Sequence, residues 1–379
     1  MKKRIFFPDL DLLRTIACMF VLVAHIAWDG LEKLYPEIAE NRFLAFFFVN
    51  GGLGVQIFFM LSGFLITYLL LQEKTSMGFI NIKNFYIRRI LRIWPLYFLV
   101  VGFVFIVYPA LKHFANLTGS SAENPLFYIF FIGNFDVIRI LGSPNASLNS
   151  MSAITWSVAI EEQFYLFWPL LFMLFSSKKV VGAMSIILLL SSTFILFNNL
   201  NGLQVYYHTF SNFLFLSTGG VLAWLYTYHN TLLQKLITGG NKARYFILAA
   251  LLLVLIYAKD HMLFTRLGFL SYWILTAVSI GWFILQLLFD PNSYAKSNEH
   301  SRWVIAGKYT YGLYMYHRIA QWSVNTAVDK FIHTEGLAVV LFKIALCFSA
   351  AIMMSVLSYK YFEKPALELK KRFALFVKN

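Results

Sequence analysis

Long runs of apolar residues recur along the chain and constrain its fold more than any other feature. Four stretches carry no Asp, Glu, Lys or Arg: 44–72, 93–111, 180–234 and 267–289. An α-helix of about 20 apolar residues crosses the hydrocarbon core of a bilayer. With 59% hydrophobic and only 13% charged residues, the chain is expected to be an integral membrane protein.

We predict an all-α fold, a polytopic transmembrane helical bundle of about ten spans. The expected spans are 9–28, 50–72, 87–109, 154–175, 180–198, 205–228, 244–259, 267–289, 303–322 and 337–360. Segment 125–140 is apolar but short, so a re-entrant or interfacial helix is expected there. We expect 1–379 to form a single integral-membrane domain that ends in a short basic cytoplasmic tail, 361–379.

The basic residues predict the orientation. With a cytoplasmic N-terminus, the predicted inner loops and tails hold 22 Lys and Arg, whereas the outer segments hold nine. This is the positive-inside pattern, so both termini are expected to be cytoplasmic. Because the net charge of +14 is dispersed over loop ends, it requires no nucleic-acid partner.

Arg14 and His25 interrupt the first apolar segment, eleven residues apart. An α-helix would place both on one face, about 16 Å apart along the axis. Ionisable residues inside a membrane normally face a protein interior or an aqueous cavity and mark a functional site.

A second group is FYIRRILRIWP, in which Arg89 and Arg92 share a helical face and Arg88 points elsewhere. Guanidinium groups bind phosphate in a bidentate manner, which suits a phosphorylated cytosolic ligand. The alternative is that these residues only orient the helix and touch anionic lipid.

A third group is WSVAIEEQFYLFWP, where Ser157 and Glu161 are four residues apart on one face. His317 lies near the outer end of the ninth expected span, so His25, Glu161 and His317 are expected to meet in the outer half. The alternatives are a helix-helix hydrogen bond for Glu161 and a satisfied interfacial side chain for His317. No metal site is expected, because the two cysteines both lie inside predicted spans.

Together these motifs resemble the acyltransferase 3 family of bacterial membrane O-acyltransferases, which includes O-antigen and exopolysaccharide acetylases, over nearly the full length. The glycine-rich stretch Gly51–Thr67 is similar to the second helix of the family, although Gln56 stands where an acidic residue is common. The other matching positions are Asp11, Arg14, His25, Arg89, Arg92, Trp156, Ser157, Glu161, Tyr311, Tyr314 and His317.

The resemblance implies a multi-pass enzyme of the bacterial cytoplasmic (inner) membrane. It would move an acyl group, commonly acetyl, from cytosolic acyl-CoA to a hydroxyl of an envelope or extracellular glycan or lipid-linked saccharide. No bound cofactor is implied; acyl-CoA is a co-substrate.

The residue types suit this reaction. Neutral His25 is the expected general base, with Glu161 orienting its ring. The other assignments are Arg14, Arg89 and Arg92 for donor binding, and Asp11, Ser157 and His317 in support. Direct attack on the thioester is favoured over an acyl-enzyme, because Cys18 would lie about 10 Å from His25 along the helix.

A different class of function also fits the intramembrane charges. In a secondary transporter or flippase of an acyl group or lipid-linked sugar, Arg, Glu and His side chains would form a proton relay or substrate path. Such proteins often contain paired repeats, and the sequence halves show no such correspondence. A structural membrane partner would leave the cost of these charges unexplained.

Overall fold

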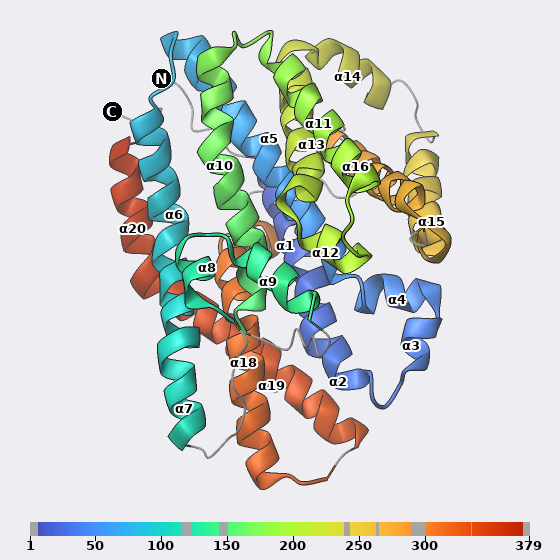
Figure 1. Cartoon of the computed structure of the whole chain (residues 1–379), viewed down its shortest axis with the longest axis vertical. Coiled ribbons are helices and arrows are strands. Elements are labelled where there is room, and N and C mark those ends of the chain that lie inside the picture. Colours follow the sequence, from blue (N-terminus) through green and yellow to red (C-terminus); the bar gives the residue numbers. More distant parts are fainter. Residues whose placement is uncertain are drawn as a thin grey trace.

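The computed structural model describes residues 7–114, 123–143, 151–238, 243–262, 265–289, 300–334 and 336–373. Over these ranges the chain consists of helices and connecting loops without a strand, as predicted for an all-α protein. The long helices lie side by side in one bundle (Figure 1). The basic start MKKR and the end of the predicted tail, 374–379, lie outside the described residues.

The α-helices, in chain order, are α1 (Pro8–Leu22), α2 (Asp29–Leu31), α3 (Glu37–Glu40), α4 (Arg42–Phe48), α5 (Gly51–Met77), α6 (Ile82–Gly102), α7 (Tyr108–Phe114), α8 (Pro125–Ile129), α9 (Gly133–Leu141), α10 (Trp156–Leu174), α11 (Val180–Phe197), α12 (Gly202–Tyr207), α13 (Thr209–Tyr228), α14 (Asn230–Thr238), α15 (Ala243–Met262), α16 (Arg266–Phe289), α17 (Arg302–Ala306), α18 (Thr310–Phe331), α19 (Leu337–Ser358) and α20 (Lys364–Lys370). Three π-helical turns, Val23–Trp28, Phe103–Val107 and Tyr359–Glu363, continue α1, α6 and α19.

Six helical segments in the described part of the chain are long and apolar enough to cross a membrane: Pro8–Leu31, Gly51–Met77, Ile82–His113, Val180–Phe197, Arg266–Phe289 and Leu337–Lys370. The other four predicted spans correspond to α10, α13, α15 and α18, which are 19, 20, 20 and 22 residues long. The total of ten spans and the orientation therefore stay predictions.

Segment 125–140 forms two short helices, α8 and α9, of five and nine residues. Neither reaches the roughly 20 residues that a span requires, as the sequence predicted. Phe131, at the turn between them, has a φ of 54°, which is unusual for a bulky side chain. Its ring stacks on Tyr97 at 4.4 Å between centroids, and its carbonyl accepts a hydrogen bond from Gln163.

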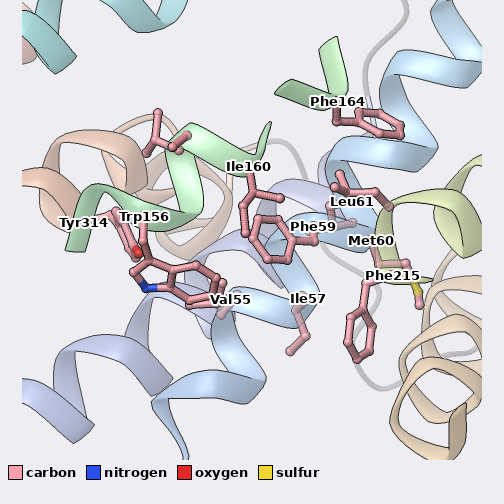
Figure 2. Packing of buried hydrophobic residues seen from close by; sticks show 14 of the residues in the cluster. Val55, Ile57, Phe59, Met60, Leu61, Trp156, Ile160, Phe164, Phe215 and Tyr314 are labelled. Atoms are coloured by element: carbon pink, nitrogen blue, oxygen red, sulfur yellow. The ribbon is translucent and has the colours of Figure 1, made fainter. Parts of the chain in front are cut away.

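Helix α5 packs between α1 and α13 in the middle of the bundle. A Cβ atom at Gly63 would lie 1.9 Å from the Leu216 carbonyl oxygen, and one at Gly219 would lie 2.1 Å from that of Met60. Only glycine allows two backbones to cross this closely, a common device in membrane bundles. Figure 2 shows the adjoining aromatic packing, in which Phe59 of α5 lies beside Trp156, with 5.9 Å between ring centroids.

The predicted basic tail begins as part of a helix. The chain stays helical from Leu337 to Lys370, and α20 packs along α6 (Figure 1). Arg88 donates a hydrogen bond of 2.9 Å to the Phe373 carbonyl. The described part of the predicted tail is therefore helical and packed against α6, whereas its cytoplasmic location stays a prediction.

Candidate active site

Two histidines from opposite ends of the chain meet inside the bundle. His25 lies in the π-helical turn that follows α1, and His317 lies on α18. His25 Nδ1 is 2.8 Å from His317 Nε2, and the two ring planes are nearly parallel. His317 Nδ1 is in turn 2.6 Å from the Tyr314 carbonyl oxygen. His317 is fully buried, whereas His25 is partly accessible.

These contacts assign the protons of the two neutral rings. A carbonyl oxygen can only accept, so His317 must carry its proton on Nδ1. The Nε2 of His317 then accepts, and His25 donates from Nδ1. This assignment, inferred from the partners, leaves the Nε2 lone pair of His25 available to take a proton.

The π-helical turn around His25 is held by α18. Gln321 donates a hydrogen bond of 2.6 Å to the main-chain carbonyl of His25. Arg318 Nη1 lies 2.5 Å from Asp29 Oδ2, one residue past the turn. π-Helical turns are frequent at functional sites. The wider turn also changes the direction in which side chains point after Leu22. The ideal α-helical spacing expected between Arg14 and His25 therefore holds only as far as Leu22.

Ser157 contacts the His317 helix rather than a histidine ring. Its hydroxyl lies 2.7 Å from Tyr314 Oη, and Tyr314 Oη donates to the Ile154 carbonyl at 3.0 Å. Because the phenol has one proton, Ser157 is the donor to Tyr314. Ser157 therefore fixes the tyrosine whose carbonyl oxygen accepts from His317.

Glu161 does not have the predicted contact with His25. Its carboxylate accepts hydrogen bonds from Ser62 at 2.6 Å and Tyr165 at 3.3 Å, and it interacts electrostatically with Arg92 and Arg14. His317 occupies the position beside His25 that was expected for Glu161. The physical reason is that Glu161 on α10 faces α5 and the arginines, a pairing that spacing within one helix cannot reveal.

Arg14 and Arg92 come together in the same part of the bundle. Arg14 forms an ion pair of 2.5 Å with Asp11, and its side chain is 20% exposed. The Arg92 side chain is solvent-accessible, although the charges of Arg14, Asp11 and Glu161 interact with it. An accessible arginine among so many interior charges indicates that water or a ligand can reach this position.

The neighbouring arginines on α6 have different surroundings. Arg88 forms a buried ion pair of 3.2 Å with Glu73, whose other oxygen accepts from the Asn81 backbone. Arg89 is also buried; its guanidinium carbon lies 5.7 Å from the centroids of the Phe85 and Tyr165 rings, and its Nε has no hydrogen-bond partner in the described chain. Arg88 thus stabilises the packing of the helices, whereas the Arg89 guanidinium has hydrogen-bond donors without a partner among the described residues.

Lys370 is a member of this cluster that the sequence reasoning missed. Its charge interacts with those of Arg14, Arg88, Arg89 and Arg92. Counting only the described residues, no hydrogen bond or ion pair involves Arg89, Arg92 or Lys370. Two arginines and a lysine that converge without a hydrogen-bonded carboxylate can bind an anion such as phosphate. The basic residues of the tail are a sequence signal for this site, although they also fit the positive-inside pattern.

Other reactive groups fit this site less well. Cys18 is buried, and its Sγ lies 3.7 Å from the Thr310 carbonyl oxygen in an apolar cluster with Leu22 and Cys347. The described residues contain no group of three His, Cys, Asp or Glu side chains that could hold a metal ion.

A family model described as an acyltransferase domain matches residues 7–358. The chain belongs to this acyltransferase family. The family resemblance of the five sequence motifs is thereby confirmed. The histidine pair and the arginines of the cluster lie within the matched region, whereas Lys370 lies beyond it.

Curated relatives of this family member are O-acetyltransferases by name. It is 28% identical over 383 residues to a Staphylococcus aureus protein whose name proposes an O-acetyltransferase, covering 96% of this chain and 58% of that protein. The peptidoglycan O-acetyltransferase OatA of Listeria monocytogenes is 27% identical over 313 residues, 76% of this chain and 48% of OatA. Bacillus subtilis YrhL, named as a proposed peptidoglycan O-acetyltransferase, is 26% identical over 95% of this chain and 55% of its own length.

The chain therefore spans about half the length of the curated relatives it matches. No solved structure matches it.

Proposed function

We propose that this family member is a membrane O-acyltransferase that moves an acyl group, with acetyl favoured, from acyl-CoA to a hydroxyl of an envelope glycan. The names of its relatives support acetyl transfer, and those of two of them make peptidoglycan the first acceptor to test. The bacterial cytoplasmic membrane is the proposed location. The observation that carries the chemistry is the His25–His317 contact of 2.8 Å, which leaves His25 Nε2 free as a base.

In the proposed reaction, His25 Nε2 takes the proton of the acceptor hydroxyl as its oxygen attacks the thioester carbonyl carbon. The carbon–sulfur bond then breaks, and the CoA thiolate takes the proton from His25. The hydrogen bond to His317 orients the His25 ring and helps to stabilise its protonated form. Ser157 acts through Tyr314 by fixing the backbone that holds His317.

The donor would bind at the arginine cluster. Arg89, Arg92 and Lys370 have unpaired donors for the phosphates of acyl-CoA. Arg14, held by Asp11, interacts electrostatically with Arg92 and is carried by the same helical segment as His25. The pantetheine arm would extend from the phosphates toward the histidine pair. Glu161 is proposed to hold the arginines in position rather than to orient His25.

The decisive experiment supplies radiolabelled acetyl-CoA to inverted membrane vesicles that contain the protein and its acceptor glycan. We expect covalent label in the glycan, and a loss of about 10²- to 10⁴-fold in the rate for the His25→Ala variant, the range for removal of a general base. Label that crosses the membrane without entering any glycan would favour the transporter alternative. Normal glycan labelling by a well-inserted His25→Ala variant would exclude His25 as the base.

A further inference from the structure

A cavity with both apolar and polar lining residues lies beside the π-helical turn that carries His25. It has a volume of 340 Å³ and opens between α2, α18 and α19. The polar residues that line it include Asp29, Lys33, Gln321, Asn325, Asp329 and Lys343. Figure 1 shows that α2 and the joined ends of α18 and α19 lie at the end of the bundle opposite α20. The cavity is therefore remote from Lys370 and the proposed donor phosphates.

The lining groups suit a neutral ligand with many hydroxyls. Two carboxylates, Asp29 and Asp329, balance two ammonium groups, Lys33 and Lys343, so an ion of either sign would meet a like charge. A volume of 340 Å³ is near the lower end of the roughly 300–1,000 Å³ typical of small-molecule sites. This space suits one sugar unit rather than an extended oligosaccharide.

Several polar atoms of the lining are available to such a ligand. Asp29 Oδ2 is occupied by Arg318, and Asp329 Oδ1 by Lys343. Among the described residues, the second oxygen of each carboxylate and the Asn325 amide nitrogen make no hydrogen bond. Carboxylate oxygens accept from hydroxyl groups, and the amide donates to ring or hydroxyl oxygens.

The cavity wall is directly connected to His25. Ile26, the next residue in the π-helical turn, lines the cavity, and so does Gln321, which donates its 2.6 Å hydrogen bond to the His25 carbonyl. A ligand held against these residues lies next to the turn that carries the proposed base.

We infer that this cavity binds the sugar unit of the acceptor and presents its hydroxyl to His25. The inference rests on the proposed acyl transfer and adds the place where the acceptor binds. Donor and acceptor then approach His25 from opposite ends of the bundle.

The test uses substitutions that fill the cavity or remove a polar group from it and that leave the proposed acyl-CoA site unchanged. Gly30 lines the cavity, and a Cβ atom there would lie 3.4 Å from the side chains of Val340 and Ile344, so Gly30→Leu places its branched end in the cavity. Asn325→Leu keeps a similar size but removes the amide. Gly182→Leu is the matched control, because a Cβ at Gly182 on α11 meets nothing within 4 Å.

Steady-state transfer is measured with acetyl-CoA and soluble fragments of a peptidoglycan digest, and the acetyl-CoA dissociation constant is measured on the same preparations. We expect Gly30→Leu and Asn325→Leu each to raise the acceptor KM at least tenfold, with the acetyl-CoA dissociation constant unchanged and Gly182→Leu like wild type. If the acceptor KM of Asn325→Leu equals that of the wild type, the inference is overturned, while transfer by the wild type still upholds the proposed function. This outcome does not depend on whether Gly30→Leu folds. Absence of transfer by the wild type would overturn both.

Discussion

His25 Nδ1 lies 2.8 Å from His317 Nε2, although 292 positions separate the two residues in the chain. The contact joins the first and ninth predicted spans. It gives one imidazole a fixed hydrogen-bond partner and leaves the Nε2 of the other available. His317, rather than Glu161, is therefore the positioning residue for the proposed base.

Substitution of His317 tests this relationship. We expect His317→Ala to lower kcat by at least about tenfold, because His25 loses the partner that fixes its tautomer and ring orientation. His317→Gln should retain more activity than His317→Ala, since the glutamine side-chain oxygen can accept from His25 Nδ1. The measurement is kcat in vesicles at saturating acetyl-CoA and acceptor. Equal activity of the two variants would mean that the hydrogen bond has no part in the reaction.

Arg88 and Arg92 should respond differently to truncation. Arg88→Ala leaves Glu73 buried without its ion pair, so we expect a loss of stability of about 3–5 kcal/mol. Acyl-CoA affinity of the folded fraction should stay close to wild type. Arg92→Ala should weaken acyl-CoA binding, and Arg92→Lys should restore it only in part because the bidentate fork is lost.

Thermal unfolding in detergent and acyl-CoA binding on the same preparations separate these two effects. If Arg92→Ala binds acyl-CoA like wild type and differs only in membrane insertion, Arg92 serves topology alone.

Lys370 offers a further test of the anion site. We expect Lys370→Gln to weaken acyl-CoA binding by about tenfold or more, because a hydrogen bond to a charged group contributes about 1.5–3 kcal/mol. Lys364→Gln is the matched control, because Lys364 lies on the same helix but is exposed. Binding is measured at low and high salt, and the difference between wild type and Lys370→Gln should shrink as salt screens the charge. The same weakening in both variants would point to a general surface potential.

The helices could be predicted from the sequence for a simple reason. In lipid, the backbone polar groups must be satisfied within the segment, so the length of an apolar run largely determines the structure. The length of the apolar run thus predicts that α5 is long enough to cross the membrane. It also predicts that α8 and α9 are too short to cross. The tail differs, because the packing of α20 on α6 depends on contacts between segments far apart in sequence.

The candidate site was predictable in its residue types but not in its pairings. Intramembrane charge singled out Arg14, His25 and Glu161, since such residues are costly without a role. Which of them touch depends on how the helices pack. Glu161 pairs with Ser62 on α5, whereas His25 pairs with His317 on α18, and neither contact has a periodic signature within one helix. The π-helical turn at His25 also changes the phase that ideal spacing assumes.

The last prediction concerns the orientation of the bundle. We expect a cysteine at Glu37 to react with an impermeant maleimide added outside intact cells, and cysteines at Thr75 or Asn230 not to react. All three positions are exposed, and the background should lack Cys18 and Cys347. Lys242 and Asn298, which the sequence places in inner loops, lie outside the described residues.

The pattern of labelling then decides between two topologies. Reaction at Thr75 and Asn230 but not at Glu37 would invert the whole bundle. Reaction at both Glu37 and Asn230 would mean that the chain crosses once more between α6 and α13. His317 would then lie on the cytoplasmic side of the later spans, which contradicts its contact with His25. Because the 2.8 Å contact requires both histidines at the same depth, we expect Thr75 and Asn230 to be protected together.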